Sequence, residues 1–96
     1  MPYYTYVIES VEGYHYTGHT PDLQRRLSEH NHSLCHSTKH GHNWRIIYFE
    51  EFSTRSEAMI REKYLKSSAG RRFLKKKIAG WSPDNDFVVI GSSSPA

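Results

Sequence analysis

The hydrophobic positions of the chain gather in three short segments rich in aromatic and β-branched residues, and polar stretches separate them. The first segment, Tyr3–Glu9, reads YYTYVIE and predicts a strand. Residues 10–13 predict a turn, and residues 14–17 predict a return strand that ends at Gly18. Residues 44–52, with the sequence WRIIYFEEF, predict a third strand. The hydrophobic pattern therefore predicts a β-hairpin and one further strand.

The segment after the hairpin carries the signals of a helix start. Thr20 is expected to be the N-cap, with Pro21 in the first turn and Asp22 as an acid favoured by the helix dipole. Leu23 and Leu27 lie one turn apart and are expected to face the core. This helix is expected to fray near residues 30–31.

Two more helices are predicted after the third strand. Thr54 and Glu57 form a capping-box pattern, which predicts a second helix to about Lys66. A third helix is expected over residues 69–79, with Gly80 as its terminator. Its apolar face is expected to carry the residues Phe73, Leu74 and Ile78.

The order of elements is β-β-α-β-α-α, which predicts an α+β fold with a three-stranded antiparallel sheet flanked by helices. Residues 32–43 are polar and lack a period, so they predict a loop. Residues 1–80 are expected to form the domain and residues 81–96 a partly disordered C-terminal tail. Within that tail, residues 86–90 predict a short strand or a docked segment.

The size of the chain, 96 residues, indicates one domain. The single Cys35 excludes an intramolecular disulfide. No run approaches the roughly 20 apolar residues of a membrane helix, and the N-terminus lacks the features of a signal peptide. We therefore expect a cytoplasmic protein, without a membrane partner, that is a monomer or a weak homo-oligomer. The formal net charge is +3, which makes phosphate-rich partners plausible without identifying one.

A glutamate stands out on the second predicted helix. Ala58, Glu62 and Leu65 fall on one stripe, so Glu62 is expected to point toward the domain body. Burying a carboxylate is costly unless a cation, a hydrogen-bond network or a metal accompanies it. Two interpretations remain open: Glu62 lies at the margin of the stripe and pairs with a nearby lysine or arginine, or it belongs to a functional site.

The tyrosines of the hairpin also allow two interpretations. Tyr4 and Tyr6 share a face of the first strand, and Tyr14, Tyr16 and Gly18 share a face of the second. Aromatic packing across strands explains such residues, and so does convergence of their hydroxyls on a phosphate or a water.

On the first helix, Arg26 and His30 lie four positions apart and face the same way. An arginine suits a phosphate, and a histidine can relay a proton near neutral pH. A solvated helix face explains the pair equally well. Five histidines between residues 30 and 42 also leave a structural zinc site as an alternative.

Together these residues resemble the GIY-YIG nuclease family over roughly residues 2–78. Tyr4-Thr5-Tyr6 stands in the place of the first motif and Tyr16-Thr17-Gly18 in the place of the second. An arginine ten residues after the second tyrosine, a histidine one turn later and a glutamate on the next helix match Arg26, His30 and Glu62. The chain looks closest to short stand-alone bacterial members related to the nuclease domain of the excision-repair incision subunit. It departs from the pattern at Tyr4, Thr5 and Thr17, and His19 replaces a lysine of some relatives.

The resemblance implies a divalent-metal-dependent endonuclease that hydrolyses phosphodiester bonds in DNA, with low sequence specificity and a role in DNA repair. It implies one Mg²⁺ or Mn²⁺ ion held by Glu62, a phosphate clamp at Arg26, Tyr6 as the general base with His30 assisting, and Tyr16 as a positioning group. Contacts to nucleic acid are expected from His19, Arg25, Lys39, Arg71, Arg72, Lys75 and Lys76. RNA as a substrate, a non-catalytic nucleic-acid-binding module, and a structural domain whose tyrosines only pack are the alternatives.

Overall fold

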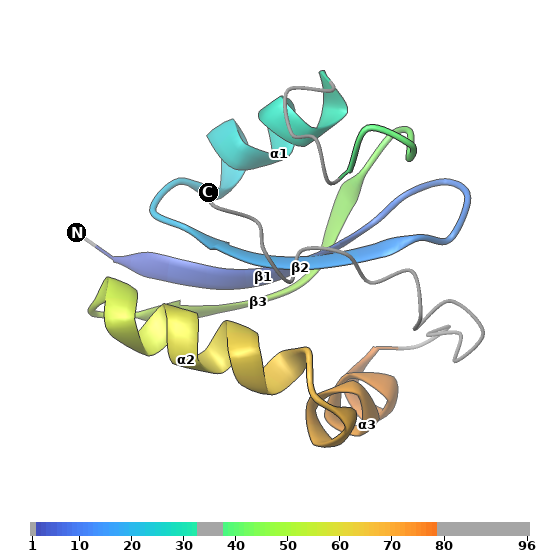
Figure 1. Cartoon of the computed structure of the whole chain (residues 1–96). Coiled ribbons are helices and arrows are strands. Elements are labelled where there is room, and N and C mark those ends of the chain that lie inside the picture. Colours follow the sequence, from blue (N-terminus) through green and yellow to red (C-terminus); the bar gives the residue numbers. More distant parts are fainter. Residues whose placement is uncertain (1, 33–37, 79–96) are drawn as a thin grey trace.

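The computed structural model describes residues 2–32 and 38–78, and within these ranges the chain forms three strands and three helices in the predicted order. The strands β1 (Tyr3–Glu9), β2 (His15–Thr20) and β3 (Arg45–Phe52) form an antiparallel sheet in the order β2-β1-β3 (Figure 1). The predicted α+β fold is confirmed. Because β1 is central, β2 and β3 are the outer strands of the sheet.

The hairpin between β1 and β2 is longer than the sequence predicted. Gly13 makes the turn with a positive φ of 92°, and its N–H donates to the carbonyl of Ser10 at 2.9 Å. The strand β2 does not end at Gly18, since Gly18 pairs with Tyr6 and the ladder continues to Thr20. Pairing with β1 thus overrides the local tendency of glycine to interrupt a strand.

The helix α1 (Leu23–Asn31) begins two residues later than a Thr20 cap would require, because Thr20 is still part of β2. Asp22 is the N-cap, and its Oδ1 accepts from the backbone N–H of Arg25 at 3.1 Å. The hydroxyl oxygen of Thr20 accepts instead from the N–H of Asp22. The helix itself is confirmed, and its expected cap was wrong.

The helices α2 (Arg55–Leu65) and α3 (Ser68–Lys77) follow β3. The capping box at the start of α2 is present in both directions: Thr54 accepts from the N–H of Glu57, and the Glu57 side chain accepts from the N–H of Thr54. The third helix begins one residue earlier than expected and ends at Lys77. Gly80 and the predicted tail, including residues 86–90, lie outside the described residues.

Helices cover both faces of the sheet, with α1 on one face and α2 and α3 on the other (Figure 1). On the α1 face the buried core consists of Tyr6, Ile8, Tyr16 and Trp44. On the α2 face it consists of Val7, Leu65 and Leu74. Successive residues of a strand point to opposite faces, so the central strand β1 contributes to both cores, through Tyr6 and Ile8 on one face and Val7 on the other. No helix in the described part of the chain is long and apolar enough to cross a membrane.

Candidate functional site

A buried hydrogen-bonded chain lies between the sheet and α1. The Tyr6 hydroxyl lies 2.9 Å from Nε2 of His30, and Nδ1 of His30 lies 2.7 Å from the Thr38 hydroxyl. The Tyr16 ring packs against the His30 ring with centroids 4.8 Å apart. Trp44 completes the cluster by donating its indole N–H to the Thr38 carbonyl at 3.2 Å. The structure therefore brings together Tyr6, Tyr16 and His30, all of them buried.

The burial of His30 determines its charge. Burial first, and then the nearby positive charge of Arg26, lower the pKa of His30 from 6.5 to about 4. The imidazole is therefore neutral at physiological pH. A neutral ring can hold the Tyr6 hydroxyl in place, but it does not fit the expected relay of a proton near pH 7.

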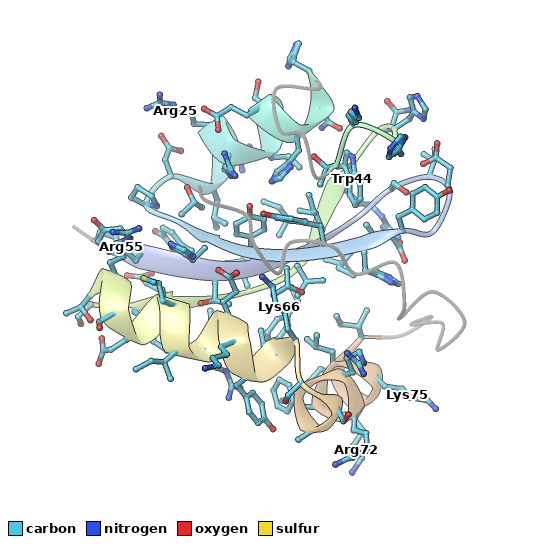
Figure 2. The ribbon with its side chains drawn as sticks, viewed as in Figure 1. Arg25, Trp44, Arg55, Lys66, Arg72 and Lys75 are labelled. Carbon is cyan, nitrogen blue, oxygen red and sulfur yellow. The ribbon has the colours of Figure 1, made fainter. Side chains whose placement is uncertain are left out.

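Glu62 lies on the other side of the sheet, in a group of its own. Its Oε1 lies 2.5 Å from Nδ1 of His19, and its Oε2 lies 2.5 Å from Nζ of Lys66. The neighbouring stripe residues Ala58 and Leu65 are fully buried. Both sequence interpretations of Glu62 are thus partly realised, since the carboxylate faces the domain body and also pairs with a lysine. Figure 2 shows Lys66 at the end of α2, on the side that faces the sheet.

The group around Glu62 fits a hard divalent cation in its donor chemistry. Mg²⁺ is often held by one or two carboxylates together with water and substrate oxygens. Nε2 of His19 is buried and has no hydrogen-bond partner among the described residues. Against an ion at this position, the Lys66 ammonium already places a positive charge beside Oε2 of Glu62. Within the described residues no group of three or more potential metal ligands of His, Cys, Asp or Glu is found, so water and substrate would have to complete the coordination of an ion at Glu62.

A cavity of about 460 Å³ opens beside His19, where β2 leads into α1. Arg26 lines it together with Arg25 from α1 and Arg55 from the start of α2. The Arg26 guanidinium bonds Glu29 at 3.0 Å, and this contact lowers the pKa of Glu29. The remaining lining residues are Tyr3, Thr20, Pro21, Asp22 and Glu29. Arginines from two elements converge here, an arrangement that suits a phosphate group.

This cavity does not bring all of the predicted catalytic residues together. The cavity is lined by Arg26 and His19, and not by Tyr6, Tyr16, His30 or Glu62. The reason is the alternation of side chains along β2. Tyr16 points to the α1 face, whereas His19 points to the α2 face and meets Glu62 there. The candidate site therefore has two halves, one on each side of the outer strand β2.

The basic residues expected to contact nucleic acid are dispersed over the surface. Arg25 lines the cavity, whereas Arg72 and Lys75 project from α3 at the opposite end of the molecule (Figure 2). Lys39, Arg72, Lys75 and Lys76 are exposed. Arg71 donates from its guanidinium to the Lys66 carbonyl at 2.9 Å, so this arginine also ties α3 to the end of α2.

The sequence predictions did not include Lys66, Arg55 or Thr38. A signal for Lys66 was present, because a lysine four residues after a glutamate on a helix commonly pairs with it. For Arg55 and Thr38 there was no such signal, since their neighbours in the site come from distant parts of the chain.

Comparisons with known proteins agree with this architecture. Residues 2–77 match the sequence model of the GIY-YIG catalytic domain, which is a nuclease domain. The chain therefore belongs to the GIY-YIG family.

Its relatives are short proteins of the group called UPF0213. The UPF0213 protein lin0209 of Listeria innocua is 40% identical over 57 residues, which are 58% of this chain and 63% of that protein. The UPF0213 protein SSP2268 of Staphylococcus saprophyticus is 32% identical over 76% of this chain and 90% of its own. The UPF0213 protein BH0048 from Bacillus halodurans, whose structure was solved by solution NMR, is 25% identical in sequence to this chain. The match covers 98% of this chain and 99% of the BH0048 chain, with a TM-score of 0.48.

Proposed function

We propose that this protein is a divalent-metal-dependent endonuclease that hydrolyses phosphodiester bonds in DNA, selecting strand or structure rather than sequence. The observation that carries the proposal is the placement of Glu62, a largely buried carboxylate held against His19 at the end of β2. His19 also lines the arginine-rich cavity. A metal-binding carboxylate and a phosphate-binding cavity would thus share one residue.

Hydrolysis of a phosphodiester requires an activated water and neutralisation of the charge that develops on the phosphate. We assign the second task to Arg26, whose guanidinium lines the cavity. Glu62 would hold one Mg²⁺ or Mn²⁺ ion, which, when bound, supplies Lewis-acid stabilisation of the phosphate and the leaving oxygen. We assign Nε2 of His19, which is buried and has no hydrogen-bond partner among the described residues, as a further contact to the substrate.

The tyrosines form the second half of the proposed site. We assign Tyr6, in its phenolate form, as the general base that takes a proton from the attacking water, and Tyr16 as the group that positions the water or the phosphate. The role of His30 is narrower than the sequence suggested, because a neutral imidazole orients the Tyr6 hydroxyl and does not store the proton. Contacts with β2 link the two halves of the proposed site, since Gly18 lies against the Tyr6 hydroxyl and His19 lies against Glu62.

The test is cleavage of end-labelled single-stranded, duplex and branched DNA, and of RNA, with and without Mg²⁺ or Mn²⁺. Glu62→Gln and Arg26→Met are expected to reduce cleavage at least about 100-fold, the usual scale for loss of a group that stabilises transition-state charge. The exposed residues Glu51 and Arg45 provide the matched controls Glu51→Gln and Arg45→Met, which are expected to cleave like the wild type. Equal cleavage by all variants would point to a contaminating nuclease and would refute the proposal.

A second candidate function, a nucleic-acid-binding module without catalysis, has one specific observation in its favour. Both carboxylate oxygens of Glu62 are engaged, by His19 and Lys66, and the Tyr6 side chain is 2% exposed. Salt-dependent binding of DNA without cleavage under any metal condition would support this function over the first.

The proposal extends to the surroundings of the site. We place Lys39 and the exposed basic residues of α3 in contact with the phosphate backbone, outside the cavity. We also propose that the protein acts in the cytoplasm, as a monomer or a weak homo-oligomer, in DNA repair. Light scattering at several protein concentrations tests the oligomeric state.

A further inference from the structure

Lys66 lies beside Glu62, and hydrogen bonds hold its backbone at both the N–H and the carbonyl. Its backbone N–H donates to the Glu62 carbonyl at 3.2 Å, and its own carbonyl accepts from the Arg71 guanidinium at 2.9 Å. The backbone of Lys66 is therefore fixed from both sides at the end of α2. The side chain then spans the one turn back to Glu62 and reaches Oε2 at 2.5 Å.

The ion pair of Glu62 and Lys66 differs from the surface pairs of this protein in its burial. The side chains of Glu62 and Lys66 are 13% and 17% exposed, whereas the side chain of Arg25, paired with Glu29, is 79% exposed. Exposed pairs are weakened by water and salt. A pair that is largely shielded from solvent is screened less than an exposed pair.

A carboxylate oxygen that receives an ammonium at 2.5 Å cannot ligate a divalent ion in the same direction. Because Oε1 of Glu62 is engaged by His19, both oxygens are occupied by nitrogen donors. We propose that Lys66 is a resident counterion of Glu62, which competes with the divalent ion for the carboxylate and lowers its affinity. This inference rests on the proposed function in that it takes Glu62 as the metal ligand.

The chemistry of lysine suits such a counterion. An ammonium on a flexible four-carbon stem is a point charge that can leave the carboxylate by rotation of the stem, without movement of the helix. The competition is therefore reversible. In the absence of the divalent ion Lys66 neutralises a largely buried carboxylate, which would otherwise be costly to bury.

Direct measurement of Mn²⁺ binding tests the competition without reference to catalysis. Titration calorimetry of the full chain with MnCl₂ is compared for the wild type, Lys66→Met and the control Lys63→Met. Methionine keeps the apolar stem and removes the charge, and Lys63 is an exposed lysine of the same helix. Lys66→Met is expected to bind Mn²⁺ about tenfold more tightly than the wild type, the change that corresponds to about 1.4 kcal/mol, and Lys63→Met to bind as the wild type does.

Two further variants separate the explanations. Lys66→Arg keeps the positive charge and is expected to bind Mn²⁺ no more tightly than the wild type. The double variant Glu62→Gln/Lys66→Met is expected to lose the gain in Mn²⁺ affinity that Lys66→Met alone shows. Equal Mn²⁺ affinity of Lys66→Met and Lys63→Met, or a gain that persists without Glu62, would overturn the inference. Thermal unfolding of each variant establishes that it is folded before titration.

The outcomes for this inference and for the proposed function are distinguishable. Cleavage that depends on Glu62, with no effect of Lys66→Met on Mn²⁺ affinity, would support the nuclease function and refute the counterion role of Lys66. Tighter Mn²⁺ binding by Lys66→Met, with no cleavage by the wild type or any variant, would support the counterion role of Lys66 and refute the nuclease function.

Discussion

The buried histidine between the two tyrosines makes the stability of this protein depend on pH in a predictable direction. In the fold the pKa of His30 is lowered to about 4, chiefly by burial and secondly by the charge of Arg26. In the unfolded chain a histidine has a pKa near 6.5. Between these two values the unfolded chain binds more protons than the fold, so the free energy of unfolding falls as the pH falls. The stability contributed by the neutral ring is fully present above pH 6.5 and lost as the pH approaches 4.

The size of the effect follows from the two pKa values. Since one pK unit corresponds to about 1.36 kcal/mol, the fall from 6.5 to about 4 is worth about 3 kcal/mol over the whole range. Between pH 7 and pH 5, where only part of the difference is realised, the expected loss is about 2 kcal/mol. That loss is large beside the 5–15 kcal/mol that is typical of the total stability of small domains.

The variant His30→Gln tests this linkage. Glutamine can still bond the Tyr6 hydroxyl but does not titrate, so its stability is expected to depend less on pH. We expect urea unfolding at pH 7 and pH 5, at constant ionic strength, to show a loss about 2 kcal/mol smaller for His30→Gln than for the wild type. The exposed His32 supplies the control His32→Gln, which is expected to retain the pH dependence of the wild type.

A result in which the wild type and His30→Gln lose the same stability between pH 7 and pH 5 would refute the reasoning. It would mean that His30 is protonated as easily in the fold as in the unfolded chain. A lower stability of His30→Gln at both pH values, with a flatter dependence on pH, would agree with the prediction, because the substitution also removes the contact of Nδ1 with Thr38.

Three further predictions follow from individual contacts. Gly18→Ala is expected to lower the free energy of unfolding by about 1–3 kcal/mol in urea, because its Cβ would lie 2.7 Å from the Tyr6 hydroxyl; unchanged stability would contradict the packing. Thr54→Ala should cost about 1 kcal/mol through loss of the N-cap, whereas Ser53→Ala should cost little. In DNA-binding titrations, replacing Lys75 and Lys76 together by alanine should reduce the salt slope by about 1.4 to 1.8, and an unchanged slope would exclude them from the interface.

The elements that the sequence predicted well are those whose signals are local. The aromatic and β-branched run of β1 specified a strand with the observed bounds. The capping box at Thr54 fixed the start of α2, because both of its hydrogen bonds form within one turn. These signals need no partner elsewhere in the chain.

The boundaries that were predicted wrongly depend on pairing between distant residues. Gly18 is a poor strand residue on its own, yet it pairs with Tyr6 and carries β2 on to Thr20. This extension moves the N-cap of α1 from Thr20 to Asp22, since a residue in the sheet ladder cannot also begin the helix. The error at the helix start is therefore a consequence of the error at the strand end.

For the candidate site, helix periodicity predicted the direction in which a side chain points but not the residues that it contacts. The stripe of α2 correctly placed Glu62 toward the domain body. Helix periodicity does not say which face of the sheet a helix covers, so it could not predict the neighbours of Glu62. In this fold α2 covers the face opposite α1, and Glu62 meets His19 there instead of Tyr6 or Tyr16.

The two halves of the candidate site are joined by adjacent residues of β2. Gly18 has no side chain on the α1 face, which leaves room for the Tyr6 hydroxyl, and His19 holds Glu62 on the α2 face. Adjacent residues of a strand are about 3.3 Å apart along the chain, so the Tyr6 hydroxyl and the Glu62 carboxylate contact neighbouring residues of β2. A substitution that shifts β2 is therefore expected to disturb both halves at once.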